Sequence, residues 1–258
     1  MDRPILFSAP MVKALIDGTK SQTRRALNPQ PAHLQVYDWK GKRLHDSEYR
    51  HWCWKGHVGA DNWDDITKQL SPFLPYALGD RLYVREAWKT HAAYDDISPA
   101  AMGGDEPILY DADGAHQTWG YPAISKIGRF RQGMHMPRWA SRLTLTVTEV
   151  RVQRLQEISE ADATAEGVVR VGGYVDCDGD PRLDGQPSTC DAYHHDASTV
   201  VTEDDLRSCA GSARWAYRSL WDKLNAEREG GAYAWASNPF VVAVSFSVIK
   251  QNIDQVKP

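Results

Sequence analysis

The sequence predicts a mixed α+β fold, in the form of a small mixed β-barrel with short flanking helices and large insertions. Two brief helices lie among short strands, and one strand reverses its apolar–polar alternation partway along. Short strands with brief helices are not typical of a parallel α/β sheet. A reversal of alternation marks a bulge or bend, which barrels use at their corners. The apolar content of 42% and the charged content of 25% predict a packed core and disfavour a disordered chain.

The N-terminal segment predicts a short helix followed by a strand or loop. Ser8 can cap a helix over residues 9–17, and Pro10 is tolerated in its first turn. Gly18 is a suitable residue to end this helix. The next stretch, 19–25, is polar, β-branched and basic, which favours the start of a strand or loop.

Two later segments alternate and therefore predict half-buried strands. Over residues 80–88, one face carries Leu82, Val84 and Glu86, and the other carries Arg81, Tyr83 and Arg85. Over residues 142–155, the apolar positions are Leu143, Leu145 and Val147, followed in the opposite parity by Val150 and Val152. The second segment is the strand whose reversal predicts a bend.

Two helices and a closing strand are expected in the C-terminal part. Ser159 can cap a two-turn helix over residues 160–166 through a capping box. The longest helix is expected over 202–229, and the apolar stretch 240–249 predicts a strand in the middle of a sheet.

Three irregular stretches separate these elements. Their Pro, Gly and acidic residues lack any sustained period, over residues 28–78, 91–130 and 168–200. We therefore expect a single domain over residues 1–258 that carries three insertions.

The composition predicts a protein of the reducing cytoplasm with neither a membrane span nor a secretion signal. The longest clean apolar run is 240–244, far short of the ~20 residues that cross a bilayer. The N-terminus lacks a basic region followed by a long apolar stretch. The four cysteines are too few and too scattered for a disulfide framework.

Charge is distributed unevenly along the chain. The net charge of −4 argues against a protein that coats nucleic acid by bulk electrostatics. Residues 126–155, however, hold seven cations and one acid, whereas residues 171–214 hold nine acids and three cations. These stretches either have different electrostatic roles or are solvated faces of a mixed-charge surface.

Four motifs, in this order along the chain, resemble the ASCH family of the PUA-like superfamily of small barrels. They are Gly18–Arg25 (GTKSQTRR), Leu78–Val84 (LGDRLYV), Ile158–Gly167 (ISEADATAEG) and Phe240–Phe246 (FVVAVSF). The phrases Phe7–Val12 and Met136–Arg142 are further similar to ASCH-type proteins encoded by tailed phages and prophages. The resemblance implies a PUA-like barrel with a nucleoside or nucleic-acid cleft, in the host cytoplasm if the chain is phage-encoded.

One enzymatic branch of this family comprises bacterial amidohydrolases that remove acyl groups from the exocyclic N4 nitrogen of cytidine. The resemblance maps their Lys, Thr and Glu onto Lys20, Thr23 and Glu166. Amide hydrolysis needs a nucleophile, a base that activates it and an acid that protonates the leaving amine. Lys20 must be neutral to act as the base, and the nearby charges of Arg24 and Arg25 favour its neutral form. In a non-catalytic alternative, phosphate is bound by Lys20, Arg24 and Arg25. Thr23 is then an ordinary strand residue, and Glu166 is a surface charge at the end of a helix.

Further cations and rings are candidates for holding the substrate. Arg138, Trp139 and Arg142, flanked by Arg129 and Arg131, combine cations with one aromatic ring. Such a set can grip phosphates and stack a base, or it can be a core tryptophan beside solvent-facing arginines. Tyr83 and Arg85 share a strand face and could line the same cleft, or they could belong to an ordinary exposed face.

We expect no cofactor and no resident metal. Potential zinc ligands are present but lack a CxxC spacing; they are Cys177, Cys190, His194, His195 and Cys209, with His51, Cys53 and His57 elsewhere. The acidic run at Asp176, Asp178 and Asp180 resembles half of a calcium loop, but Pro181 and Pro187 replace its required Gly and Glu. A metal-dependent ribonuclease that uses these carboxylates remains an alternative to the amidohydrolase.

Overall fold

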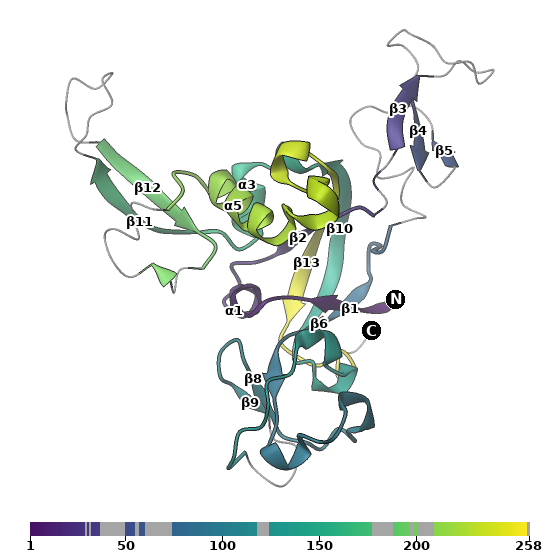
Figure 1. Ribbon diagram of the computed structural model, residues 1–258, viewed down its shortest axis with the longest axis vertical. Coiled ribbons are helices and arrows are strands. Elements are labelled where there is room, and N and C mark those ends of the chain that lie inside the picture. Colours follow the sequence, from purple (N-terminus) through teal and green to yellow (C-terminus); the bar gives the residue numbers. More distant parts are fainter. Residues whose placement is uncertain are drawn as a thin grey trace. The chain divides into compact units, whose positions relative to one another are not determined.

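The computed structural model describes residues 1–28, 30, 32–36, 50–54, 57–59, 74–117, 124–176, 188–196, 199–200 and 209–256 (Figure 1). The chain divides into two compact units, each made of several stretches. Unit 1 comprises Met1–Ser21, Leu78–Thr148 and Phe246–Pro258, and unit 2 comprises Gln22–Ala77 and Glu149–Ser245. Strands and helices occur in both units, so the expected α+β class is confirmed.

The elements of unit 1 are mostly short. They are β1 (Asp2–Leu6), α1 (Ala9–Ile16), β6 (Arg81–Arg85), β7 (Trp88–Lys89), β8 (Ile108–Tyr110) and β9 (His116–Gln117), with 3-10 helices at Ala92–Tyr94, Pro99–Ala101, Gly133–His135 and Arg138–Ala140. Two long strands, β10 (Thr144–Arg154) and β13 (Phe240–Ile249), contribute residues to both units.

Unit 2 contains the other helices and strands. They are β2 (Gln22–Ala26), β3 (Ala32–Val36), β4 (Arg50–Trp54), β5 (His57–Gly59), α3 (Glu160–Ala165), β11 (Val169–Asp176), β12 (Ser188–His194) and α5 (Ala213–Asn225), with 3-10 helices at Leu155–Glu157, Arg228–Gly231 and Trp235–Ser237.

The main sheet has the strand order β1-β6-β10-β13-β2. β1 pairs in parallel with β6, β6 pairs antiparallel with β10, and β13 pairs antiparallel with β2. Three smaller sheets are β11-β12, β3-β4-β5 and β7-β8-β9. The main sheet ends at β1 and β2, so its described strands form an open sheet and not the closed barrel that we expected.

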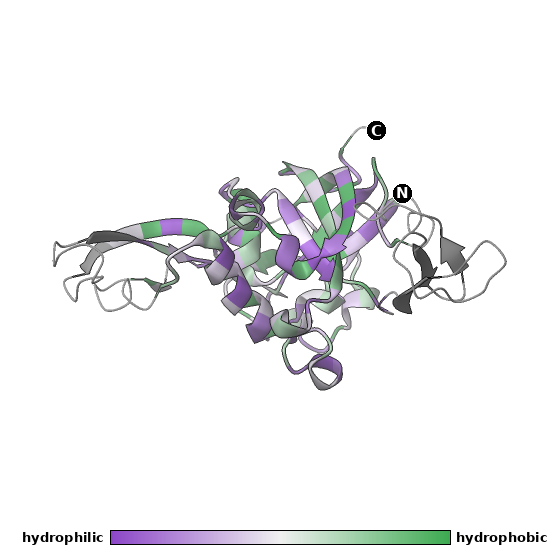
Figure 2. Ribbon diagram, turned by 90° about the horizontal axis from the view of Figure 1, so that it is seen from above, coloured by the Kyte–Doolittle hydropathy of each residue, from purple (hydrophilic) through white to green (hydrophobic). Residues whose placement is uncertain are grey.

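Strand β10 has the predicted reversal of parity. Leu145 and Val147 are buried, Thr148 and Glu149 are exposed, and the next buried residue is Val152. An odd separation between buried positions moves the apolar residues to the other face of the strand. Figure 2 shows hydrophobic and hydrophilic bands alternating along several strands. The reversal coincides with the point where the chain passes from unit 1 to unit 2.

The two brief helices match the prediction, whereas the long helix begins later than expected. α3 has its capping box, in which the Ser159 side chain accepts from Asp162 N. We expected this helix to begin at residue 202, but α5 begins at Ala213 and residues 209–212 are not helical. Ser212 caps it by accepting a hydrogen bond from Trp215 N, which satisfies an N–H group of the first turn. Residues 201–208 lie outside the described part of the chain.

Each unit has its own apolar cluster. The cluster of unit 1 consists of Trp88, Met102, Ile108, Tyr110, Met136 and Ala140. The cluster of unit 2 joins the helices α3 and α5 to the neighbouring strands, through Leu155, Ile158, Ala163, Val168, Ala213, Ala216, Tyr217, Trp221, Trp235 and Val241. Packing of α3 against α5 and beside β2 fixes the positions of the polar groups described next.

Within the described residues we find no helix long and apolar enough to cross a membrane.

Candidate functional site

In unit 2, strand β2 and helix α3 bring a buried arginine against two carboxylates. The Nη1 atom of Arg24 lies 3.2 Å from Glu166 Oε1 and donates to Gln22 Oε1 at 2.5 Å. The Nη2 atom of Arg24 lies 3.0 Å from Asp162 Oδ2. Buried charges of this kind persist in folded proteins when they are paired. Arg24 Nε is buried and has no hydrogen-bond partner among the described residues.

Helix α3 explains why both carboxylates reach Arg24. Asp162 and Glu166 are four residues apart, so they share one face of the helix. Asp162 also completes the capping box, whereas Glu166 is the C-cap residue. A carboxylate at a helix C-terminus is unfavourable because of the helix dipole. The guanidinium of Arg24 offsets this cost, and it thereby fixes the orientation of the Glu166 side chain.

Neighbouring groups perturb the acidities around this cluster. Burial raises the pKa of Asp162, but the hydrogen bond from Arg151 and the charge of Arg24 together outweigh it and hold the pKa below its usual value. Burial and the charge of Glu166 raise the pKa of Tyr217 well above its usual value. The ring of Tyr217 lies 6.0 Å from the Arg24 guanidinium carbon. Tyr217 is therefore a neutral phenol beside the cluster at any physiological pH.

The other candidates on β2 point to the second face of the strand. Successive strand residues alternate in direction, so Thr23 shares a face with Arg25, and Arg24 shares a face with Gln22. The hydroxyl of Thr23 accepts a hydrogen bond from Arg25 Nη1 at 2.8 Å. Arg25 also donates to the carbonyl of Arg24 at 3.0 Å. The structure thus joins Arg24 to Glu166, and Thr23 to Arg25.

Lys20 belongs to unit 1 and is buried there. Lys20 follows α1, and its backbone N–H donates to the carbonyl of Ala14 in the last turns of that helix. Its Nζ atom lies 5.7 Å from the centre of the Phe7 ring. Lysine is almost never fully buried, so this position is unusual for its residue type.

Strand β6 places two of the expected binding residues together. Arg85 Nη2 donates to the Tyr83 hydroxyl at 3.3 Å, and the guanidinium carbons of Arg85 and Arg138 lie 5.4 and 5.7 Å from the Tyr83 ring centre. Tyr83 is buried, although the sequence pattern assigned it to a polar face. The ring contributes to a packed cluster of cations rather than to an open strand face.

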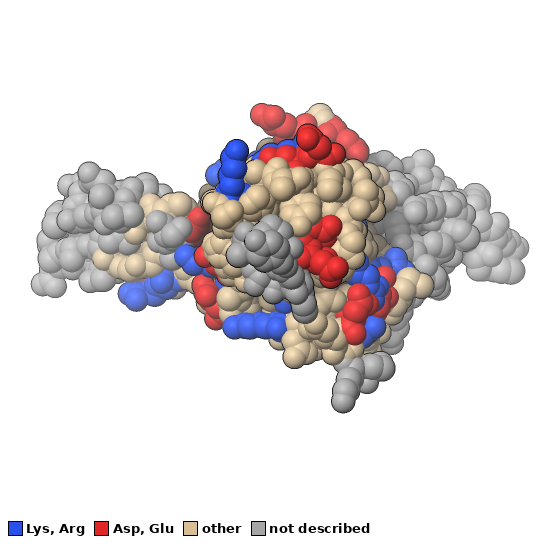
Figure 3. Space-filling view, turned by 90° about the horizontal axis from the view of Figure 1, so that it is seen from below, with Lys and Arg blue, Asp and Glu red and all other residues tan. Residues whose placement is uncertain are grey.

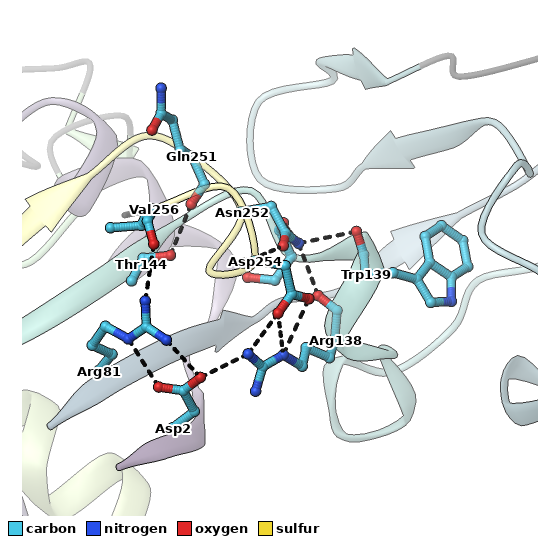
Figure 4. Close-up of polar contacts among 10 residues, drawn as sticks. Asp2, Arg81, Arg138, Trp139, Thr144, Gln251, Asn252, Asp254 and Val256 are labelled. Atoms are coloured by element: carbon cyan, nitrogen blue, oxygen red, sulfur yellow. Dashed lines mark hydrogen bonds and ion pairs between the residues drawn. The ribbon is translucent and has the colours of Figure 1, made fainter. Parts of the chain in front are cut away.

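Arg138 connects the first strand to the C-terminal segment of unit 1 (Figure 4). It donates to Asp2 at 2.7 Å and to Asp254 at 2.6 Å. Arg81 donates two further hydrogen bonds of 2.9 Å to the Asp2 carboxylate. Hydrogen bonds from Arg81 and Arg138 hold the pKa of Asp2 below its usual value. The guanidinium of Arg138 is thus engaged by the protein's own carboxylates.

Trp139 lies beside this network without joining it through its ring. Its carbonyl accepts a hydrogen bond from Asn252, and the ring points away from the polar contacts in Figure 4. The ring packs partly buried against the apolar cluster of unit 1, close to Gly104.

Arg142 forms an ion-paired network of its own. It makes two bonds to Glu86, of 2.8 and 2.9 Å, and one of 2.8 Å to Asp113. Its guanidinium carbon lies 4.0 Å from the centre of the Tyr110 ring. The N–H groups of the guanidinium are thus bound by carboxylates, and the group also lies over an aromatic ring.

The metal candidates contribute little to the described part of the chain. Cys177, Asp178, Asp180, Pro181 and Pro187 lie outside the described residues, as do the side chains of His51, Cys53, His57, Asp176 and Cys190. The rings of His194 and His195 are 4.3 Å apart, and Cys209 is half-buried. No group of three or more potential ligands converges among the described side chains.

Sequence reasoning missed three members of the unit 2 cluster: Gln22, Asp162 as a partner of Arg24, and Tyr217. The spacing of Asp162 and Glu166 along one helix contained a usable signal. No local pattern indicated Tyr217, because α5 follows α3 by almost 50 residues.

Neither the charge distribution on the surface nor the comparisons with known proteins identify a ligand for these residues. On the face shown in Figure 3, Lys and Arg side chains are interspersed with Asp and Glu side chains. No family model matches the chain, and neither does any curated protein or solved structure.

Proposed function

We propose that this chain is an ASCH-type protein with a PUA-like fold that binds a modified nucleoside and hydrolyses an amide on the exocyclic nitrogen of an acylated cytidine. The observation that carries the proposal is the burial of the three residues named by the resemblance. Lys20 is 1% exposed, Thr23 is 1% exposed and Glu166 is 5% exposed. Ionisable groups withdrawn from water are candidates for catalysis because their proton affinities can be tuned.

Each of the three residues has a chemical role in the proposed reaction. The resemblance assigns the role of base to Lys20, which must be neutral to accept a proton, and the role of nucleophile to Thr23 or a water molecule. The activated oxygen attacks the acyl carbon, and the bond to the exocyclic nitrogen breaks. The proton taken up by the base then passes to the leaving nitrogen by way of the Glu166 carboxylate, which Arg24 holds in place. Water supplies the remaining atoms, so the products are cytidine and a carboxylic acid.

The proposed partner is a nucleoside or a nucleic acid that carries the modified base. The proposal needs no cofactor and locates the protein in the cytoplasm, that of a bacterial host if a phage encodes it. Arg85 lies over the Tyr83 ring in unit 1 and supplies a cation for recognition of the nucleoside, while the buried ring supports the guanidinium.

Mass-spectrometric detection of deacylation tests this function directly. The purified full chain is incubated with N4-acetylcytidine and with its deoxy analogue, with and without a chelator. We expect turnover that survives chelation and is lost in Lys20→Met. Lys13→Met is the matched control, because Lys13 is an exposed lysine in α1, and it should retain turnover.

Two results would contradict the proposal. Absence of turnover on both acyl nucleosides would leave a non-catalytic binding module as the better explanation. Loss of activity on chelation would favour the metal-dependent ribonuclease, in which case RNA cleavage should appear on addition of a divalent cation.

A further inference from the structure

The segment that runs from Lys126 to Met134 in unit 1 is held in a fixed conformation. Its backbone pairs with residues 88–92, through bonds that include Gly128 N to Thr90 O at 2.8 Å and Arg131 N to Trp88 O at 2.9 Å. A Cβ atom at Gly128 would lie 2.9 Å from the Thr90 carbonyl oxygen. A Cβ atom at Gly133 would lie 2.8 Å from the carbonyl carbon of Glu86. The two glycines therefore allow a close backbone approach that other residues would prevent.

The structure separates the cations of the basic stretch 126–155 into two groups. Five of them contact other groups of the protein. Arg131 donates to the carbonyls of Ile97 and Tyr94, and Arg154 lies over the Phe240 ring. The other three pair with carboxylates; they are Arg138, Arg142 and Arg151. Lys126 and Arg129 are exposed. Their side chains form no ion pair within the described part of the chain.

Large apolar side chains are exposed beside these two cations. Ile127, Phe130 and Met134 are 59%, 55% and 56% exposed. Leu6 is also exposed, and its Cδ1 atom lies 2.8 Å from the Cβ position at Gly133. We call the exposed side chains of Lys126, Ile127, Arg129, Phe130 and Met134 the 126–134 strip.

The segment that forms the strip carries cations and no acidic residue. No Asp or Glu occurs between residues 126 and 148 of the sequence. The nearby carboxylate of Asp95 accepts the backbone N–H of Arg129 at 2.9 Å, and that of Asp111 pairs with Lys89 at 3.0 Å. Lys89 Nζ lies 6.0 Å from the centre of the Phe130 ring. The strip thus presents an aromatic ring among cations.

We propose that the 126–134 strip binds single-stranded nucleic acid, with Lys126 and Arg129 on phosphates and Phe130 stacked on a base. Cationic segments with exposed rings bind single strands in this way, since every base has a face that can stack. This proposal rests on the proposed function in one respect: the modified cytidine would be part of a nucleic-acid strand. It assigns the nucleic-acid contact to a segment distinct from Arg138 and Arg142, whose guanidinium groups already pair with carboxylates.

Fluorescence anisotropy with labelled single-stranded oligonucleotides of about 12 nucleotides, one RNA and one DNA, tests this surface. We expect binding of at least one of them, weakened about tenfold or more in the double variant Lys126→Glu, Arg129→Glu. The salt dependence of log K should fall in magnitude by about 1.4, which corresponds to about 0.7 for each lost phosphate contact. Phe130→Ala should weaken binding about tenfold and leave the salt dependence unchanged.

The double variant Lys13→Glu, Lys250→Glu is the matched control. Both lysines are exposed residues of unit 1, and the charge change is the same. Equal weakening in the two double variants would overturn the proposal, as would absence of binding to both oligonucleotides. Strip-dependent binding to phosphatidylserine vesicles without oligonucleotide binding would also overturn it. Deacylation of the free nucleoside with no oligonucleotide binding would reject the strip while the proposed function stands.

Discussion

Arg24 in unit 2 and Arg138 in unit 1 each bind two carboxylates, but they do so in different surroundings. The Arg24 side chain is 0% exposed and pairs with Glu166 and Asp162 on a single helix. The Arg138 side chain is 37% exposed and pairs with Asp2 and Asp254, which lie near opposite ends of the chain. The two networks therefore contain the same chemical groups with unequal access to water.

This difference in exposure decides what each network can contribute. Water and salt screen the charges around Arg138, so its ion pairs act mainly as weak ties between segments. The charges around Arg24 are little screened, so removing one of them leaves buried groups of opposite charge with fewer partners in the interior. We therefore expect the stability of unit 2 to depend strongly on Arg24, and that of unit 1 to depend only weakly on Arg138.

Replacement of Arg24 should have the largest effect. Arg24→Met removes the cation and leaves Glu166 buried beside Asp162, so we expect a loss of about 3–5 kcal/mol in the free energy of unfolding. Urea denaturation followed by circular dichroism measures this loss.

A second variant shows whether the loss arises from uncompensated charge. Arg24→Met combined with Glu166→Gln removes the buried carboxylate as well and should be more stable than Arg24→Met alone. A single-variant loss below about 1 kcal/mol would show that Arg24 behaves like a surface arginine, and the contrast with Arg138 would disappear.

Replacement of Arg138 should have a smaller effect. Arg138→Met breaks half-exposed ion pairs, each worth about 0–1 kcal/mol, and Arg81 remains to hold Asp2. The loss should shrink further as salt is added, because the pairs are screened. Urea denaturation at low and high salt measures both quantities. A loss as large as that of Arg24→Met, unchanged by salt, would mean that the Arg138 network is as isolated from water as the Arg24 network.

Local features of the fold could be predicted from the sequence. Ser159 and Asp162 stand at capping-box spacing, and the structure has both bonds of that box. The parity reversal of β10 was visible in the order of its apolar residues and is present in the burial pattern. Both features depend on residues within a few positions of one another, where backbone geometry decides the outcome.

Features that depend on distant partners could not be predicted. Arg138 lies 136 residues from Asp2 and 116 from Asp254, and Arg142 lies 56 from Glu86. A run of cations in the sequence therefore predicted ligand-binding arginines, because the carboxylates that occupy them were not visible locally. Likewise, the motif around Arg24 indicated a cation but not its enclosure by Gln22, Asp162 and Tyr217.

The pH dependence of stability should give the smallest effect and the finest test of the exposed network. Because the pKa of Asp2 is lowered in the folded protein, its ionised form stabilises the fold at any pH above its unfolded value of about 3.9. This contribution is lost as the pH falls from about 4 through the lowered folded value. Asp2→Asn should therefore make stability fall less steeply below pH ~4 than it does in the wild type. Urea denaturation at several acidic pH values measures these slopes. Parallel slopes for Asp2→Asn and the wild type would mean that Arg81 and Arg138 do not bias the ionisation of Asp2, and that their contacts only tie segments of the chain together.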